Sequence, residues 1–150
     1  MSDMKRIMPP TLFYACIISM VLLAWLWPIT TVIEFPFNVL GVVPLSLGLG
    51  ISIWGSEKFG RVGTTVKTFD EPSKLVTDGL FRFSRNPMYL GFASALLGIW
   101  TLLGALSPLL GVVIFVVVTD RWYIPFEERT LVERFGGQFQ DYAARTRRWI

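Results

Sequence analysis

The fold is decided by the longest uncharged stretch of the chain, residues 86–119, which reads NPMYLGFASALLGIWTLLGALSPLLGVVIFVVVT. A membrane-spanning helix needs about 20 mostly apolar residues, because the hydrocarbon layer is about 30 Å thick and each residue adds about 1.5 Å. The stretch is therefore too long for one straight span. The sequence GALSP at residues 104–108 marks a break, since Ser favours the position before a helix and Pro its first turn. We expect two spans, 88–103 and 108–124, joined by a tight hairpin.

Two further uncharged stretches lie closer to the N-terminus, at residues 7–33 and 35–56. Each is long enough for one helix, and we place these spans at 11–33 and 37–56. The N-terminal stretch is read as a retained helix rather than a secretory signal peptide, because its apolar part is too long. The sequence thus predicts an all-α polytopic membrane protein, a single domain over residues 1–150 with four transmembrane helices.

The basic residues indicate the orientation of this four-span arrangement, because all 14 of them fall on one side of it. Loops that are rich in Lys and Arg usually lie on the cytoplasmic side of the membrane. We therefore expect both termini, the 57–87 loop and the 125–150 segment on the cytoplasmic side of a bacterial inner membrane. Because the basic residues flank hydrophobic helices, membrane lipids explain them more simply than nucleic acid does, and no nucleic-acid partner is expected.

Composition excludes several kinds of chemistry. The chain has no histidine and one cysteine, Cys16. Catalytic triads, a histidine base, histidine or cysteine metal sites and an internal disulfide are therefore excluded, and no metal is expected. No phosphate-binding glycine motif occurs. Gly48 and Gly50 lie within the second predicted span, where small residues commonly let neighbouring helices approach closely.

Polar residues gather at the beginning of the third predicted span. Pro87 biases Asn86 towards an extended backbone, so the helix is expected to begin at about this point. Arg85, Asn86 and Tyr89 then lie at a helix N-terminus, which attracts carboxylates or phosphates. An ordinary helix start, with Arg and Tyr facing lipid headgroups, explains the same residues.

Two adjacent acids, Glu127 and Glu128, follow the fourth predicted span. Acids at a membrane boundary need cationic partners, and the candidates are Arg85, Arg121 and Arg129. The pair either forms a structural salt bridge or holds a cationic ligand near the membrane surface. Further on, a tail of aromatic and basic residues, 139–149, is expected to lie on the bilayer surface.

These motifs form a long ordered pattern: RNPMYLG at 85–91, a hydrophobic hairpin, EExxLxxxFG at 127–136 and FxxY at 139–142. The pattern resembles the integral-membrane methyltransferases, namely isoprenylcysteine carboxyl methyltransferases and phospholipid N-methyltransferases. The resemblance runs from about Gly60 to the C-terminus, and more weakly through GLG at 48–50. Isoprenylcysteine enzymes have Arg-His-Pro where this chain has Arg-Asn-Pro, so the chain is more similar to the phospholipid branch.

The resemblance implies that S-adenosylmethionine is the cofactor, held between the cytoplasmic loop and the C-terminal helices. One of the two glutamates would bind its ammonium group, while Arg85 and Asn86 would meet its carboxylate. Arg121 would hold an anionic acceptor or headgroup, and Tyr89 would lie near the transferred methyl group. Arg121, Tyr89 and Glu128 are thus the expected catalytic residues. The cofactor-binding residues implied are Gly48, Gly50, Lys74, Leu75, Val76, Phe81, Arg85, Asn86, Pro87, Met88, Tyr89, Glu127 and Glu128.

The expected function is methyl transfer to a lipid or other hydrophobic acceptor at the cytoplasmic membrane face. The acceptor stays open: a lipid amine, a prenylated carboxylate, a thiol or another hydrophobic molecule. Two other functions also stay open. One is a non-enzymatic four-helix scaffold, and the other is an NADPH-dependent enzyme similar to the sterol reductases.

Overall fold

The protein is described by a computed structural model that covers residues 7–65 and 67–150, in which the regular structure is helical. The helices over these residues are, in chain order, α1 (Pro9–Leu26), η1 (Phe37–Gly41), α2 (Val42–Val62), η2 (Gly79–Arg82), α3 (Pro87–Leu103), α4 (Leu109–Val118), η3 (Thr119–Tyr123), α5 (Ile124–Phe135) and α6 (Gly137–Arg145). Their bounds confirm the all-α class.

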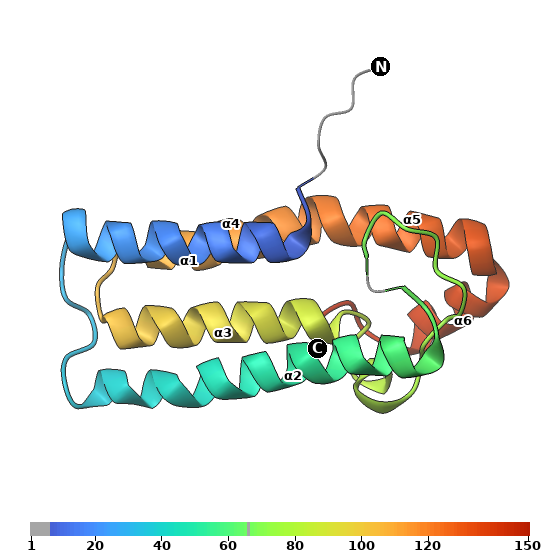
Figure 1. The fold of residues 1–150 in the computed structure, drawn as a ribbon, viewed down its shortest axis with the longest axis horizontal. Coiled ribbons are helices and arrows are strands. Elements are labelled where there is room, and N and C mark those ends of the chain that lie inside the picture. Colours follow the sequence, from blue (N-terminus) through green and yellow to red (C-terminus); the bar gives the residue numbers. More distant parts are fainter. Residues whose placement is uncertain (1–6, 66) are drawn as a thin grey trace, which may run out of the picture.

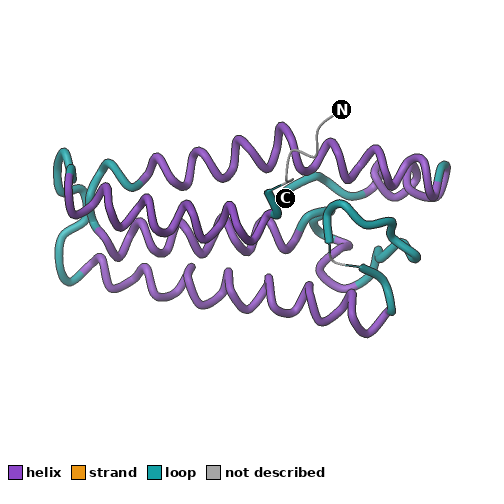
Figure 2. The backbone as a smooth tube through the Cα atoms, turned by 45° about the horizontal axis from the view of Figure 1, so that its top comes forward, coloured by secondary structure: helices purple, strands orange, loops and turns teal. Residues whose placement is uncertain are grey.

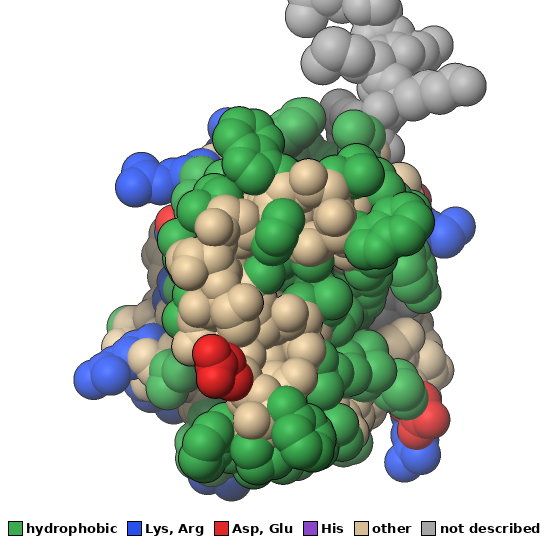
Figure 3. All heavy atoms as spheres, turned by 90° about the vertical axis from the view of Figure 1, so that its left-hand side faces the viewer, with side chains coloured by type: hydrophobic (Ala, Val, Ile, Leu, Met, Phe, Trp, Pro, Cys, Tyr) green, Lys and Arg blue, Asp and Glu red, His purple; other side chains and the backbone are tan. Residues whose placement is uncertain are grey.

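The long helices lie side by side as a bundle, with α3 next to α2 and α1 next to α4 (Figure 1, Figure 2). The connections 27–36 and 104–108 lie at one end, where hydrophobic side chains cover much of the surface (Figure 3). The 63–86 segment, α5 and α6 lie at the other end. Most charged residues of the chain are in this second end, which we call the polar end.

Three helical segments are long and apolar enough to cross a membrane: Pro9–Leu26, Phe37–Val62 and Leu109–Phe135. The fourth apolar helix, α3, has 17 residues and is shorter than these. Its bounds agree closely with the predicted 88–103 segment. The sequence therefore located all four apolar helices.

The first helix ends earlier than the sequence prediction, at Leu26 instead of residue 33. Pro28 explains the difference, because a proline disfavours helical backbone in the residue before it and has no N–H to donate. Residues 27–36 instead form a connection that is bonded to the other loop at this end. Val32 N donates to Gly104 O at 2.7 Å, and Leu106 N donates to Thr30 O at 2.9 Å.

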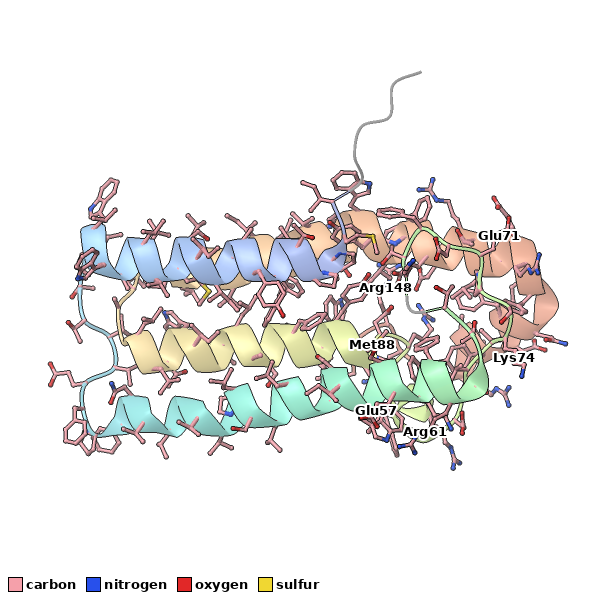
Figure 4. The ribbon with its side chains drawn as sticks, viewed as in Figure 1. Glu57, Arg61, Glu71, Lys74, Met88 and Arg148 are labelled. Atoms are coloured by element: carbon pink, nitrogen blue, oxygen red, sulfur yellow. The ribbon has the colours of Figure 1, made fainter. Side chains whose placement is uncertain are left out.

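The second helical segment begins at Phe37 as predicted, with the 3₁₀ turn η1, but α2 continues beyond the predicted end at residue 56 to Val62. It ends at Gly63, whose φ of 73° suits glycine. The last turns of α2 therefore carry Glu57, Lys58 and Arg61, which the sequence prediction assigned to the loop. Glu57 and Arg61 project outward from α2 in Figure 4.

The fourth predicted span does not end at Ile124. Instead α4 continues through the π-helical segment Thr119–Tyr123 into α5, as one long helix up to Phe135. Pro125 lies just after this π segment. A proline removes one i→i−4 hydrogen bond, and a wider π turn lets the helix continue past that missing bond.

The segments η1 and α2 pack closely against α3 because glycines meet across their contact. A Cβ added at Gly48 would collide with the backbone of Gly91, and one at Gly41 would collide with that of Gly98. Ser52 Oγ also donates to the carbonyl of Met88 at 3.0 Å. This contact fixes the beginning of α3, and with it Met88, against α2 at the polar end.

The position of the C-terminal tail differs from the sequence prediction, which placed residues 139–149 on the bilayer surface. Phe139 and Tyr142 of α6 are buried against Val76 and Phe81, so they face the protein instead of the bilayer. Tyr142 Oη donates to the Phe81 carbonyl at 2.6 Å. Burial raises the pKa of Tyr142 to about 12, so the hydroxyl keeps its proton at neutral pH.

Candidate functional site

Two adjoining cavities lie at the polar end, on either side of Met88 and Glu127. The arginine-side cavity, of about 90 Å³, lies between the beginning of α3, α5 and α6. The loop-side cavity, of about 100 Å³, lies between the end of α2, the 65–72 loop and α5. Figure 4 shows Met88 at the beginning of α3, between these elements.

Most of the site residues implied by the resemblance surround the arginine-side cavity. They come from three separate parts of the chain: the 74–81 loop, the beginning of α3 and the first turn of α5. The implied residues that line it are Lys74, Leu75, Val76, Phe81, Arg85, Asn86, Pro87, Met88, Tyr89, Glu127 and Glu128.

Three of the implied residues lie elsewhere. Gly48 is buried in the contact between α2 and α3, and Gly50 faces open space. Arg121 has a side chain that is 84% exposed and pairs with the neighbouring Asp120 at 3.7 Å. None of the three lines either cavity, so the structure gives Gly48 a packing role and places Arg121 on the surface.

Glu128 is held by two arginines. Its carboxylate accepts from Arg85 Nη2 at 2.8 Å and from Arg148 Nη2 at 2.7 Å. The hydrogen bond from Arg148 to Glu128 raises the pKa of Arg148 above its ordinary value. Arg148 also lies 3.5 Å from Asp120, which accepts from Trp149 Nε1 at 2.9 Å.

Arg85 and Asn86 hold the C-terminal tail against the beginning of α3. Arg85 Nη1 donates to the carbonyls of Ala143 and Thr146, at 2.8 and 3.0 Å. Asn86 Nδ2 donates to the carbonyl of Arg148 at 3.0 Å. Arg85 Nη1 and Asn86 Nδ2 therefore hold the tail and assemble one wall of the cavity, whereas Arg85 Nε is buried without a hydrogen-bond partner among the described residues.

Glu127 has different surroundings from Glu128. It is partly buried, lines both cavities and accepts a hydrogen bond of 2.7 Å from Tyr89 Oη. Among the described residues no cation lies within ion-pair distance of it. A carboxylate withdrawn from water without a cation is electrostatically unsatisfied, so this position favours a positively charged ligand.

The site also contains residues that sequence reasoning missed. Thr68 is buried, and its hydroxyl lies 3.3 Å from Tyr89 Oη, in contact with the group that donates to Glu127. Arg148 completes the ion cluster around Glu128. A lone Thr in a polar loop gives no sequence signal, and Arg148 is one of three arginines in the tail that the sequence does not distinguish.

The loop that carries Thr68 is closed at its base. Thr64 Oγ1 accepts from the backbone N–H groups of Ser73 and Lys74, at 3.1 and 3.4 Å, and Ser73 Oγ donates to the Gly63 carbonyl at 3.0 Å. These bonds hold the two ends of the loop together. Its middle therefore covers the loop-side cavity as a compact surface loop.

Named proteins with similar sequences are methyltransferases. The chain is 37% identical over 79 residues to protein-S-isoprenylcysteine O-methyltransferase B of Arabidopsis thaliana, covering 51% of this chain and 39% of that protein. It is 31% identical over 147 residues to methanethiol S-methyltransferase 1 of Bradyrhizobium diazoefficiens, covering 85% of this chain and 49% of that protein. The chain thus spans half or less of these two relatives, and no solved structure gives a significant match.

A family match covers most of the site. The sequence model of the phospholipid methyltransferase family matches residues 36–138, which include the lining residues of both cavities except Phe139 and Tyr142 of α6. The match begins before α2 and ends within α6, so it contains the glycine contact, the loop and both glutamates. The chain therefore belongs to the phospholipid methyltransferase family, which contains the integral-membrane methyltransferases that the motifs resemble.

Proposed function

We propose that this chain transfers a methyl group from S-adenosylmethionine to a hydrophobic acceptor at the cytoplasmic face of the membrane. The observation that carries the proposal is the carboxylate of Glu127, which lines both cavities and has no ion-pair partner among the described residues. Family membership supports methyl transfer as the reaction.

The residues around the arginine-side cavity suit this cofactor. Glu127 would bind its ammonium group, and the apolar side chains of Val76, Phe81 and Met88 offer a surface for its uncharged part. Because Arg85 and Asn86 hold the tail, we assign the cofactor carboxylate to Lys74 instead. Lys74 lines the same cavity, and no described carboxylate lies within ion-pair distance of it.

When bound, S-adenosylmethionine would supply the reactive methyl carbon. The protein would then mainly hold donor and acceptor in line and keep water away, which can lower a barrier by about 7–11 kcal/mol. Tyr89 donates to Glu127 and thereby fixes the position of its carboxylate. The two cavities adjoin at Met88 and Glu127, which line both of them.

The membrane setting follows from helix length and charge. We propose that α3 is the fourth span, because 17 residues extend about 26 Å and the helix lies among the longer ones. With four spans, the polar end and both termini face the cytoplasm by the positive-inside rule. This end would then meet membrane lipids in a bacterial inner membrane.

Calorimetric titration of the detergent-purified protein tests the proposal, with NADPH as the control titrant. We expect saturable binding of S-adenosylmethionine and none of NADPH. Binding of NADPH alone would instead favour a reductase. Binding of neither by folded protein would favour a scaffold, and the proposed methyl transfer would then be wrong.

A further inference from the structure

The ring of Tyr123 packs against the tyrosine that donates to Glu127. Tyr123 and Tyr89 are buried in the same hydrophobic cluster, with ring centroids 6.4 Å apart and ring planes 11° from parallel. Aromatic rings whose centroids are about 4.5–7 Å apart attract each other in such offset arrangements. Tyr89 therefore has a fixed aromatic neighbour beside its ring, while its hydroxyl reaches Glu127 at 2.7 Å.

Tyr123 is itself held on several sides. Its hydroxyl donates to the carbonyl of Ile7, just before α1, at 2.7 Å. The centroid of its ring lies 5.8 Å from that of Trp122 and 6.5 Å from that of Phe69, in the loop that covers the loop-side cavity. Only 2% of Tyr123 is exposed, and it lines neither cavity. It can therefore act on a bound ligand only through its neighbours.

The π-helical segment explains why Tyr123 faces the interior. Phe115, Thr119 and Tyr123 are spaced four residues apart, and all three are buried. In an α-helix, four residues turn by about 40° more than one full turn, so such a row would rotate away from the interior. The π segment Thr119–Tyr123 has a wider turn, which keeps the row on the inner face. The same segment therefore brings Tyr123 beside Tyr89.

We propose that Tyr123 is a positioning residue, whose ring holds Tyr89 in the direction that lets it donate to Glu127. The inference rests on the proposed function, in which Glu127 is the counter-charge of the cofactor ammonium. The hydrogen bond from Tyr89 keeps this carboxylate at one place in the wall of the two cavities. Without the ring of Tyr123, Tyr89 gains freedom to turn, and the carboxylate must be ordered again whenever the cofactor binds.

Titration of S-adenosylmethionine into the full chain in detergent tests this role. Tyr123→Leu removes the ring and should weaken binding about fivefold, as expected for the loss of one aromatic pair. Tyr123→Phe keeps the ring and should restore the original affinity. Unchanged affinity in Tyr123→Leu, or an equal loss in Tyr123→Phe, would overturn the inference. If Tyr123→Leu does not fold, Tyr123→Met replaces it, because methionine fills irregular spaces in a core.

Phe115 provides the matched control for the loss of a buried ring. It lies on the same long helix, but its ring packs against Phe13 and Phe92 instead of Tyr89. Phe115→Leu should therefore lower the melting temperature and leave cofactor affinity unchanged. If Phe115→Leu weakened binding as much as Tyr123→Leu, the effect would be one of stability and the positioning role would be wrong.

A double-mutant cycle shows whether Tyr123 acts through Tyr89. Tyr89→Phe keeps the ring and removes the hydroxyl that donates to Glu127. In that background Tyr123→Leu should change cofactor affinity little, because the hydrogen bond that the ring directs is already gone. A purely structural role would instead weaken binding about fivefold in both backgrounds, and this result would overturn the inference.

An NMR measurement on the cofactor-free protein keeps this inference separate from the proposed function. The chain has four tyrosines, so labelling their Cζ atoms with ¹³C gives few signals, and the one lost in Tyr89→Phe belongs to Tyr89. We expect Tyr123→Leu to shift this signal and Phe115→Leu to leave it in place. If the cofactor binds but Tyr123→Leu leaves the signal in place, the positioning role is wrong and the proposed function stands. If S-adenosylmethionine does not bind the original chain, the proposed function fails, and with it the role of Tyr123 in cofactor binding, even where the signal shifts.

Discussion

Glu127 and Glu128 are neighbours in the sequence and opposite in their surroundings. Glu128 faces two arginines at 2.7 and 2.8 Å, while Glu127 faces a tyrosine hydroxyl and two cavities. Successive helical residues point about 100° apart, so one turn of α5 presents the two carboxylates to different parts of the protein. An adjacent acidic pair can thus have one member in an ion cluster and the other at a cavity wall, and we propose that only the second of these, Glu127, binds the ligand.

The sharpest test replaces each glutamate by its amide. Glu127→Gln should weaken S-adenosylmethionine binding at least 100-fold, about 2.7 kcal/mol, because the cofactor ammonium loses its counter-charge. Thermal stability should stay nearly unchanged, since no ion pair of the described residues is broken. Calorimetric titration and a thermal melt measure the two effects.

Glu128→Gln should give the reverse pattern. The substitution leaves Arg85 and Arg148 without their shared carboxylate, so the melting temperature should fall while cofactor affinity changes severalfold at most. If Glu128→Gln abolished binding and Glu127→Gln did not, the roles assigned to the two carboxylates would be exchanged.

The glycines of α2 allow a second test, because the resemblance assigned both Gly48 and Gly50 to the cofactor. A side chain at Gly48 would collide with the backbone of Gly91, whereas nothing lies within 4 Å of a Cβ at Gly50. We expect Gly48→Leu to destabilise the fold by about 2 kcal/mol through overpacking. Gly50→Leu should leave stability and cofactor affinity unchanged, as measured by thermal melts and titration.

A loss of cofactor affinity in Gly50→Leu, with normal stability, would contradict the placement of this residue outside the site. Comparing Gly48→Leu with Gly50→Leu also distinguishes a residue that contacts the cofactor from one that only supports the site. Gly48 acts on the site through α3, because the close contact holds Met88 against α2.

Substitutions of the C-terminal arginines should have a smaller effect on stability. Arg148 joins Glu128 and Asp120, while Arg147 Nη1 makes only an exposed contact of 3.5 Å with the Ile150 carbonyl. Arg148→Gln should cost about 1 kcal/mol of stability, with cofactor affinity little changed. Arg147→Gln should cost nothing measurable. Equal losses in the two variants, by thermal melt, would show that the ion cluster does not stabilise the tail.

Sequence reasoning located the apolar helices because long uncharged stretches are typical of helices that cross a membrane. It misplaced their ends where one local residue outweighed the apolar pattern. Pro28 ended α1 early, and Pro125 failed to end α4 because a π turn preceded it. Hydropathy alone does not register either effect, since both depend on backbone hydrogen bonds.

The site was predictable to the extent that its residues occur in motifs. The pattern from Arg85 to Tyr89, with Glu127 and Glu128, identified one cavity wall and the two candidate acids for binding a ligand. It did not distinguish the two acids, because that depends on Arg148, which lies 20 residues further along the chain. Nor did it find Thr68, whose importance comes only from the folding of its loop over Tyr89.

Thr68 gives the smallest expected effect and the finest test of how Glu127 is held. Its hydroxyl lies 3.3 Å from Tyr89 Oη, which in turn donates to Glu127. Thr68→Val keeps the size and removes the hydroxyl, so Glu127 keeps its hydrogen bond from Tyr89 but loses the one from Thr68. We expect about threefold weaker cofactor binding, about 0.6 kcal/mol, and Thr68→Ser should restore it. A larger loss of cofactor affinity, equal to that of Glu127→Gln, would mean that Thr68 contacts the ligand itself. Glu127 would then share the binding of the cofactor with Thr68 at the boundary between the two cavities.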